Sequence, residues 1–336
     1  MHKEVDNLLL SIIVPVYNAE NTLYTCLVSI LNQDTSDCQI VIINDGSTDS
    51  SQKIIEDFAS KFQNVRHYCL PENQGIGKTR NLGIKHSSGK YITFVDADDY
   101  VSQNYIECIK SNIIDMDLDM LVLSYHRTYT RKKYIYEKFY KFSSWDLFNQ
   151  KISPSLYPEM IYKLEVASWL RVIKRSILEN NEQLCFSDRN SAEDLEASLK
   201  WYLKIQNVLV TDEKLYHYVI RPNSLNFNKN QVLDFEKILK NVCDFYIQND
   251  EFTRYFAELE YIFTQHLLIS NLLRLMINKD EGNQFKFDLL RNSLLQYFPN
   301  YKNNIYLKKA PINIRFVIYL TYKYPRLFKV ILKIAI

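Results

Sequence analysis

The chain has 336 residues and a nearly balanced charge, with 41 Lys and Arg against 39 Asp and Glu and a formal net charge of +2. At roughly 150 residues per domain, this length predicts two domains, each large enough to bury a hydrophobic core. The apolar fraction of 47% beside 24% charged residues argues against extensive disorder. The small net charge argues against a general nucleic-acid binder, so we expect no nucleic-acid partner.

The six cysteines lie singly, with no C-x-x-C pair and no histidine at zinc-site spacing. This usage is typical of small buried side chains in a reducing compartment and predicts a cytoplasmic location. We expect no signal peptide, because Lys3 is followed at once by Glu4 and Asp6. No run of about 20 uncharged apolar residues occurs, so no membrane-spanning helix is expected.

Short apolar runs alternate with helical patterns over the first 125 residues, which is typical of βαβ units on a mostly parallel sheet. The expected strands, in chain order, are residues 8–16, 39–43, 65–70, 91–95 and 120–124. The expected helices lie near residues 23–31, 54–62, 78–86 and 104–114. Residues 125–218 give no clear pattern, whereas a helical period from Gln231 onward predicts a helical C-terminal third.

Polar residues follow three of the expected strands, at Tyr17, at Asp45 and at the acidic cluster that begins with Asp96. The carboxyl ends of the strands are the ligand-binding edge of an open α/β sheet. The cluster holds three carboxylates within four positions, which raise one another's pKa unless a cation shares the site. Hard oxygen ligands suit Mg²⁺ or Mn²⁺, so the sequence predicts a metal-assisted site at this edge.

Four segments, in this order and spacing, resemble the family 2 glycosyltransferases of the GT-A fold: SIIVPVYN at 11–18, NDGSTD at 44–49, NQGIGKTRNLG at 73–83 and DADD at 96–99. The resemblance is close over residues 8–125 and is specific as a set. It implies an α/β fold, a Rossmann-like, mostly parallel sheet flanked by helices. Residues 1–225 would be the nucleotide-sugar-binding and catalytic domain, and residues 226–336 a helical C-terminal region.

The resemblance implies donor-binding roles at the first three segments. Pro15, Tyr17 and Asn18 would form the rim of the nucleotide pocket, where an aromatic ring can stack on a base. Asp45 would accept a hydrogen bond from the ring N–H of a uracil-like base, and Arg80 would donate to phosphate or nucleobase. The ordinary alternatives are turns after strands at the first four positions and a solvated helix charge at Arg80.

The fourth segment is implied to hold the sugar nucleotide and its cation. Asp96 would accept from a ribose hydroxyl, and Asp98 would bind the Mn²⁺ or Mg²⁺ ion that bridges the diphosphate. Such an ion makes a nucleoside diphosphate a better leaving group by neutralising its developing charge. Asp99 is left as a neighbour of the metal site or a helix cap.

Glu193 and Asp194 resemble the acidic pair of the same family. Glycosyl transfer with inversion needs a base that takes the proton from the incoming hydroxyl. Leu195, Leu199 and Leu203 at spacing four predict that the pair opens a helix, where acidic residues are also ordinary partners of the helix dipole. We predict Asp194 as the base, with Glu193 as the runner-up or orienting neighbour.

Three further residues lie in segments that resemble the family around this pair. Trp169 is expected either in the acceptor pocket or in the core. His217 and Arg221 belong to a stretch that resembles a loop closing over the donor, so they are candidates for diphosphate contacts, with packing as the alternative for His217.

Residues 312–336 mix apolar and basic side chains without a single acidic one. A basic amphipathic helix of this kind binds anionic membrane surfaces, although the same pattern also suits a helix packed on its neighbours. The membrane interpretation predicts a peripheral location on the inner face of the cell membrane. A lipid-linked saccharide in bacterial capsule, lipopolysaccharide or cell-wall polymer assembly is then the natural acceptor.

The resulting prediction is an inverting, metal-dependent glycosyltransferase that moves a single sugar from a nucleotide sugar, a UDP-sugar by preference, to a saccharide acceptor. No Gln-x-x-Arg-Trp motif of the processive members is present. A catalytically inactive nucleotide-sugar-binding module is the alternative, opposed by the joint presence of Asp96, Asp98 and Asp194. A nucleotidyltransferase would need a Gly-rich, Lys-bearing phosphate loop near the N-terminus, which is missing. Nothing in these patterns specifies the donor sugar, the linkage or the oligomeric state.

Overall fold

The computed structural model describes residues 8–131, 134–139, 146–179, 181–188, 192–221, 231–271, 283–310 and 312–327. The chain divides into two compact units. One contains residues 1–157 and 163–225, and the other contains residues 158–162 and 226–336.

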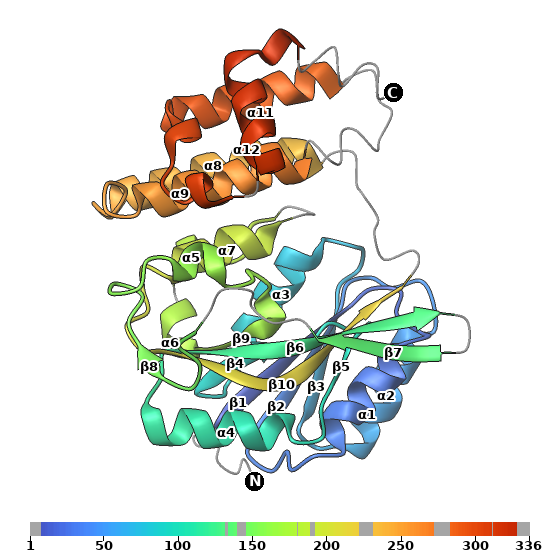
Figure 1. The fold of residues 1–336 in the computed structure, drawn as a ribbon. Coiled ribbons are helices and arrows are strands. Elements are labelled where there is room, and N and C mark those ends of the chain that lie inside the picture. Colours follow the sequence, from blue (N-terminus) through green and yellow to red (C-terminus); the bar gives the residue numbers. More distant parts are fainter. Residues whose placement is uncertain are drawn as a thin grey trace. The chain divides into compact units, whose positions relative to one another are not determined.

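The first unit is built on a mixed sheet whose main strand order is β3-β2-β1-β4-β9-β6-β10-β5 (Figure 1). These strands are β1 (Leu10–Val16), β2 (Cys38–Asn44), β3 (Val65–Cys69), β4 (Tyr91–Phe94), β5 (Tyr100–Val101), β6 (Met120–Arg131), β9 (Arg171–Lys174) and β10 (Val208–Ile220). Two more strands, β7 (Tyr134–Phe139) and β8 (Lys151–Ile152), pair with β6 and β10.

Strand β1 lies between β2 and β4 and runs parallel to both. All seven of its residues are buried, as expected for a strand covered on both faces. The register pairs Val16 with Asn44 and Ile13 with Phe94, so the three strands end at one edge. That edge brings together the segments that follow β1, β2 and β4.

Helices flank this sheet in Figure 1. They are α1 (Leu23–Leu31), α2 (Ser51–Lys61), α3 (Ile76–Lys85), α4 (Tyr105–Met116), α6 (Arg175–Leu178) and α7 (Glu193–Trp201). The first turn of α7 carries the acidic pair, as the leucine spacing predicted.

The second unit is helical. It contains α8 (Gln231–Gln248), α9 (Phe256–Phe263), the π-helical segment η3 (Thr264–Ser270), α11 (Asn283–Tyr297) and α12 (Ile312–Lys323), besides most of the short helix α5 (Met160–Lys163). Phe298 is fully buried and packs against Phe252, Phe256 and Phe263. No helix in the described ranges is long and apolar enough to cross a membrane.

The predicted fold class is therefore confirmed, with a large central sheet, flanking helices and a helical C-terminal region. Strand β9 and most of β10 lie in residues 125–218, where no clear pattern was found in the sequence. Strand β9 runs antiparallel between β4 and β6, and β10 runs parallel to β6.

Candidate active site

The loops after β1 and β2 are joined by hydrogen bonds at the common strand edge. The backbone N–H of Asn18 donates to Ser47 Oγ at 3.0 Å, and the Asn18 side-chain oxygen accepts from the N–H of Thr48 at 2.8 Å. Asn18 has a φ of 48°, a left-handed conformation that asparagine tolerates better than most residues. The two loops therefore form one rim rather than two independent turns.

Asp45 is buried behind this rim and holds a third loop. Its two carboxylate oxygens accept from the backbone N–H groups of Gln74 and Gly75 at 2.7 and 3.0 Å. Gly46 follows with a φ of 64°, and a Cβ there would lie 2.5 Å from the carbonyl carbon of Glu72. Both oxygens of Asp45 thus accept hydrogen bonds from the loop at Gln74 and Gly75. The expected contact of Asp45 with a nucleobase stays a prediction.

A cavity of about 550 Å³ opens at this edge. Its lining includes six of the predicted donor-binding residues: Pro15, Tyr17, Asn18, Arg80, Asp96 and Asp98. Arg221 also lines it, whereas Asp45, Trp169, His217, Glu193 and Asp194 do not. Its volume falls within the range of small-molecule sites. The side chain of Tyr17 is 50% exposed at this cavity, as a ring available for stacking must be.

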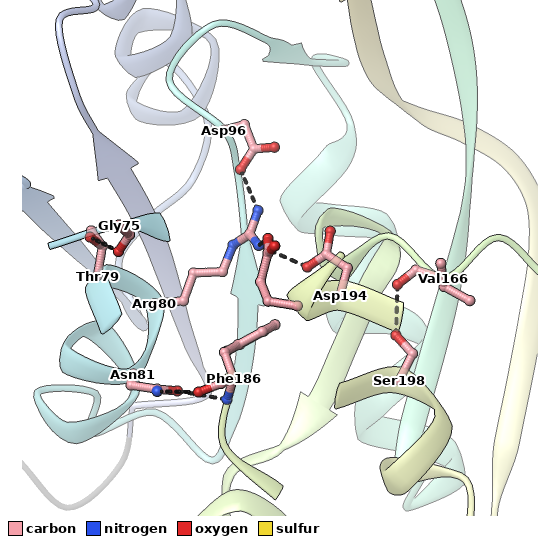
Figure 2. A network of polar contacts seen from close by, with 10 residues as sticks. Gly75, Thr79, Arg80, Asn81, Asp96, Val166, Phe186, Asp194 and Ser198 are labelled. Carbon is pink, nitrogen blue, oxygen red and sulfur yellow. Dashed lines mark hydrogen bonds and ion pairs between the residues drawn. The ribbon is translucent and has the colours of Figure 1, made fainter. Parts of the chain in front are cut away.

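Arg80, on α3, connects the cavity to the acidic pair (Figure 2). The side chain is only 3% exposed, and its guanidinium contacts three carboxylates. Nη2 donates to Asp96 Oδ1 at 3.1 Å, while Nη1 donates to Glu193 Oε1 and Asp194 Oδ1, both at 2.7 Å. Burial opposes the charge of Arg80, but the three carboxylates outweigh it and raise its pKa. The guanidinium thus binds carboxylates within the protein, and the predicted contact of Arg80 with phosphate or nucleobase stays a prediction.

The segment before α7 is fastened to α3 by a reciprocal pair of hydrogen bonds, visible in Figure 2. Asn81 Nδ2 donates to the carbonyl of Phe186 at 2.7 Å, and the N–H of Phe186 donates back to Asn81 Oδ1 at 2.9 Å. The Arg80 guanidinium lies 5.3 Å from the Phe186 ring centroid. At Gly77 a Cβ would approach Ser187 O to 2.1 Å, so only glycine permits this contact.

Glu193 and Asp194 share a buried setting with different access to solvent, since their side chains are 9% and 21% exposed. Burial, reinforced by the charge of Asp194 and opposed by Arg80, raises the pKa of Glu193 to about 7. Burial also raises the pKa of Asp194, against the charge of Arg80. Neighbouring carboxyl groups whose pKa values are raised by burial are better suited to accept a proton than ordinary surface carboxylates.

Asp98 and Asp99 lie in different surroundings. Asp98 is half-exposed, and Arg221 Nη1 donates to its carboxylate at 3.0 Å. Asp99 is buried and accepts from Tyr216 Oη at 2.9 Å and from the N–H of Val219 at 2.7 Å, which fastens β10 to the acidic loop. Burial raises the pKa of Asp99 well above its ordinary value. Asp99 therefore anchors this loop, a role that the sequence did not indicate.

Trp169, in the short 3-10 helix Ser168–Leu170, and His217, on β10, both pack against aromatic side chains. Trp169 is buried and stacks on Tyr216, with ring centroids 4.4 Å apart. The His217 ring lies between Tyr100 and His126, at 4.4 and 5.0 Å. These contacts correspond to the packing alternatives.

Asp96 and Asp98 are the candidate ligands for a metal ion at this site. Within the described residues no group of three or more His, Cys, Asp or Glu side chains is arranged to hold one. Asp98 is half-exposed in the cavity wall, and Asp96 uses Oδ1 for Arg80 while its second oxygen points away from the guanidinium (Figure 2). Mg²⁺ is commonly held by one or two carboxylates together with substrate phosphates. These residues fit an ion that binds together with a diphosphate.

The family model for glycosyl transferase family 2 matches residues 11–180, just over half of the chain. The chain belongs to this family. GlyA, a glycosyltransferase of Streptococcus pneumoniae, is 34% identical over 224 residues, which cover 65% of this chain and 31% of GlyA. The uncharacterised glycosyltransferase EpsJ of Bacillus subtilis is 32% identical over 226 residues, covering 65% of this chain and 62% of EpsJ. The chain thus spans less than two thirds of the length of either relative.

A solved structure shows the same fold. Staphylococcus aureus TarS 1–349 in complex with UDP-GlcNAc superposes with a TM-score of 0.74 at 21% identity, covering 94% of this chain and 89% of that one. The full-length protein is named poly(ribitol-phosphate) β-N-acetylglucosaminyltransferase.

Proposed function

We propose that this family 2 protein transfers a single sugar from a nucleoside diphosphate sugar to a hydroxyl group of a saccharide, with inversion at the anomeric carbon. The observation that carries the proposal is the Arg80 network. It joins a nucleotide-sized cavity to a carboxylate pair with raised pKa values. UDP-GlcNAc bound to TarS, a protein of the same fold, favours a UDP-sugar as donor.

The chemistry is a single displacement. The acceptor oxygen forms a bond to the anomeric carbon, the bond from that carbon to the diphosphate oxygen breaks, and the acceptor proton passes to Asp194. We assign this role to Asp194 because its side chain is more exposed than that of Glu193 while both bind the same nitrogen of Arg80. Glu193 then orients the guanidinium, and Arg80 holds both carboxylates against the loop of Asp96.

We propose that Asp98 holds the Mn²⁺ or Mg²⁺ ion, with Asp96 beside it. The ion, when bound, neutralises charge that develops on the leaving diphosphate. Arg221, which already pairs with Asp98 at 3.0 Å, supplies a second positive charge at the same wall of the cavity.

We further propose residues 1–225 as the nucleotide-sugar-binding and catalytic domain and residues 226–336 as a helical C-terminal region with a basic amphipathic tail. The proposed acceptor is a lipid-linked saccharide that is used in the assembly of a bacterial cell-surface polysaccharide. The proposed location of the enzyme is the inner face of the cell membrane. The polymer named in the TarS activity supports a cell-surface acceptor.

Donor turnover with Mn²⁺ tests the proposal in Asp98→Asn and Asp194→Asn. Loss of the base should lower turnover by about 10² to 10⁴-fold. Loss of the metal ligand should lower it by at least about 100-fold. Asp57→Asn is the matched control, because Asp57 only pairs with Lys61 on the surface. Wild-type turnover in Asp194→Asn would disprove the base assignment. Donor binding without turnover in the wild type would favour the inactive module.

A further inference from the structure

Helix α12 presents apolar side chains to solvent along one face. Ile312, Phe316 and Tyr319 are exposed, Phe316 by 59% of its surface, and they recur at the spacing of a single helix face. Tyr324 and Leu327 continue the exposed apolar set just beyond the helix. Five large apolar side chains are thus exposed within sixteen residues. Exposed apolar residues on the surface of ordinary soluble proteins are usually more scattered than this.

The opposite side of α12 is already used by the protein core. Ile318 and Thr321 are buried, and Arg291 on α11 donates to the carbonyl groups of Thr321 and Tyr322 at 2.8 and 3.1 Å. These bonds satisfy carbonyls at the helix C-terminus and fix its rotation. The exposed side chains are therefore held outward by the packing of the helix.

Basic side chains accompany this apolar face. Arg315, Lys323 and Arg326 are exposed, and the Lys323 ammonium lies 5.8 Å from the ring centroids of both Tyr319 and Tyr324. Arg315 Nη1 donates to the carbonyl of Lys308, which brings a further basic residue alongside. In the sequence, nine Lys and Arg but no Asp or Glu follow Asp288. No acidic side chain in this stretch offsets the positive charge.

We propose that the α12 face, defined as Ile312, Phe316, Tyr319, Tyr324 and Leu327 with Arg315, Lys323 and Arg326, lies on an anionic phospholipid surface. Exposed aromatic and aliphatic side chains flanked by Lys and Arg are the composition that partitions into the headgroup region. The helix has 12 residues and a length of about 18 Å, which is too short to span a bilayer core of about 30 Å, so it lies along the surface. The inference rests on the proposed location at the membrane but not on the transfer chemistry.

Sedimentation of the full chain with vesicles tests the inference. The protein should sediment with vesicles of phosphatidylcholine mixed with phosphatidylglycerol and stay in solution with phosphatidylcholine alone. Arg315→Glu/Lys323→Glu should weaken binding at least about tenfold, because each basic residue near anionic lipid contributes about fivefold. The matched control Lys53→Glu/Lys85→Glu carries the same charge change on exposed residues of the first unit and should bind like the wild type.

Phe316→Ser should also weaken binding without lowering the melting temperature, since the ring is exposed. Equal binding to both vesicle types, or wild-type binding by Phe316→Ser and the double variant together, would overturn the inference. So would a dimer in light scattering that Phe316→Ser dissociates, because a second copy would then be the partner. Sugar transfer to a soluble acceptor, measured on the same variants, separates this inference from the proposed function. Its absence in every variant and in the wild type would count against the transfer chemistry alone.

Discussion

Replacing Arg80 by Met would leave Asp96, Glu193 and Asp194 in one partly desolvated pocket without their common counter-charge. Methionine keeps much of the side-chain length and removes only the guanidinium. Removing one partner of a buried ion pair costs about 3–5 kcal/mol, because the remaining charge is left uncompensated. Little screening by solvent is expected, since Arg80 is 3% exposed and each carboxylate is less than a quarter exposed.

This free energy converts into a large thermal shift. A domain of this size loses about 2–4 °C in Tm per kcal/mol, so Arg80→Met should unfold about 6–20 °C below the wild type. The loss of stability in Arg80→Met should depend on pH. Arg80 lowers the pKa of Glu193 and of Asp194, so its removal raises both. A carboxyl group whose native pKa is raised above its unfolded value favours the fold at low pH and loses that contribution as pH rises through the native pKa.

Thermal unfolding of both proteins at about pH 8 and about pH 5 is the assay, and the Tm difference should shrink at the lower pH because protonation relieves the repulsion. Lys61→Met removes a surface pair with Asp57 and should cost at most about 1 kcal/mol at either pH. If Arg80→Met fails to fold, Arg80→Lys is the substitute variant. It keeps the positive charge but loses the forked guanidinium, so its Tm should lie below that of the wild type and its unfolding should be less severe than that of Arg80→Met. A variant as stable as the wild type at pH 8, or a difference that does not shrink in acid, would refute the reasoning.

Three further outcomes follow from the site. The kcat/KM of the wild type should fall as pH drops, with an acid limb above the range of an ordinary aspartate, because burial raises the pKa of Asp194 and of its neighbour Glu193; a pH–rate profile whose acid limb lies at about pH 4 would contradict this. Tyr17→Ala should raise the donor Kd by about 5- to 100-fold if the exposed ring stacks on a base, as titration calorimetry can measure, with Tyr24→Ala as the exposed control. Gly77→Ala should lower Tm and turnover together, because its methyl group would press on Ser187 O and shift α3; unchanged values for both would show that the segment yields freely.

The sequence predicted β1, β2 and β4 well because these strands are almost entirely buried and so appear as largely apolar runs. Leu10–Val16 and Cys38–Asn44 fall almost where expected. Strand Val208–Ile220 was missed because polar residues interrupt it and its register shifts beside β6. Strands β9 and β10 take their places through partners distant in sequence, which local patterns do not reveal.

At the site, the sequence predicted several residues that line one cavity, but it did not predict their contacts. Arg80 stood in the expected motif, yet its partners Glu193 and Asp194 lie more than a hundred positions later. Only the tertiary structure shows that the Arg80 guanidinium donates hydrogen bonds to carboxylates of α7. Asn81 belongs to the same motif, and it forms two hydrogen bonds with Phe186. These bonds could not be predicted, because the segment that contains Phe186 has no periodic sequence pattern from which its position could be inferred.

The distance in sequence between Arg80 and its partners also bears on how the chain acquires its structure during synthesis. Strands β1 to β4 and helix α3 leave the ribosome first, carrying a guanidinium that finds one carboxylate, Asp96, within that half. The two short bonds from Nη1 form only after α7 has emerged. Until α7 has been synthesised, Glu193 and Asp194 are absent, so the Arg80 network of the first unit is electrostatically incomplete.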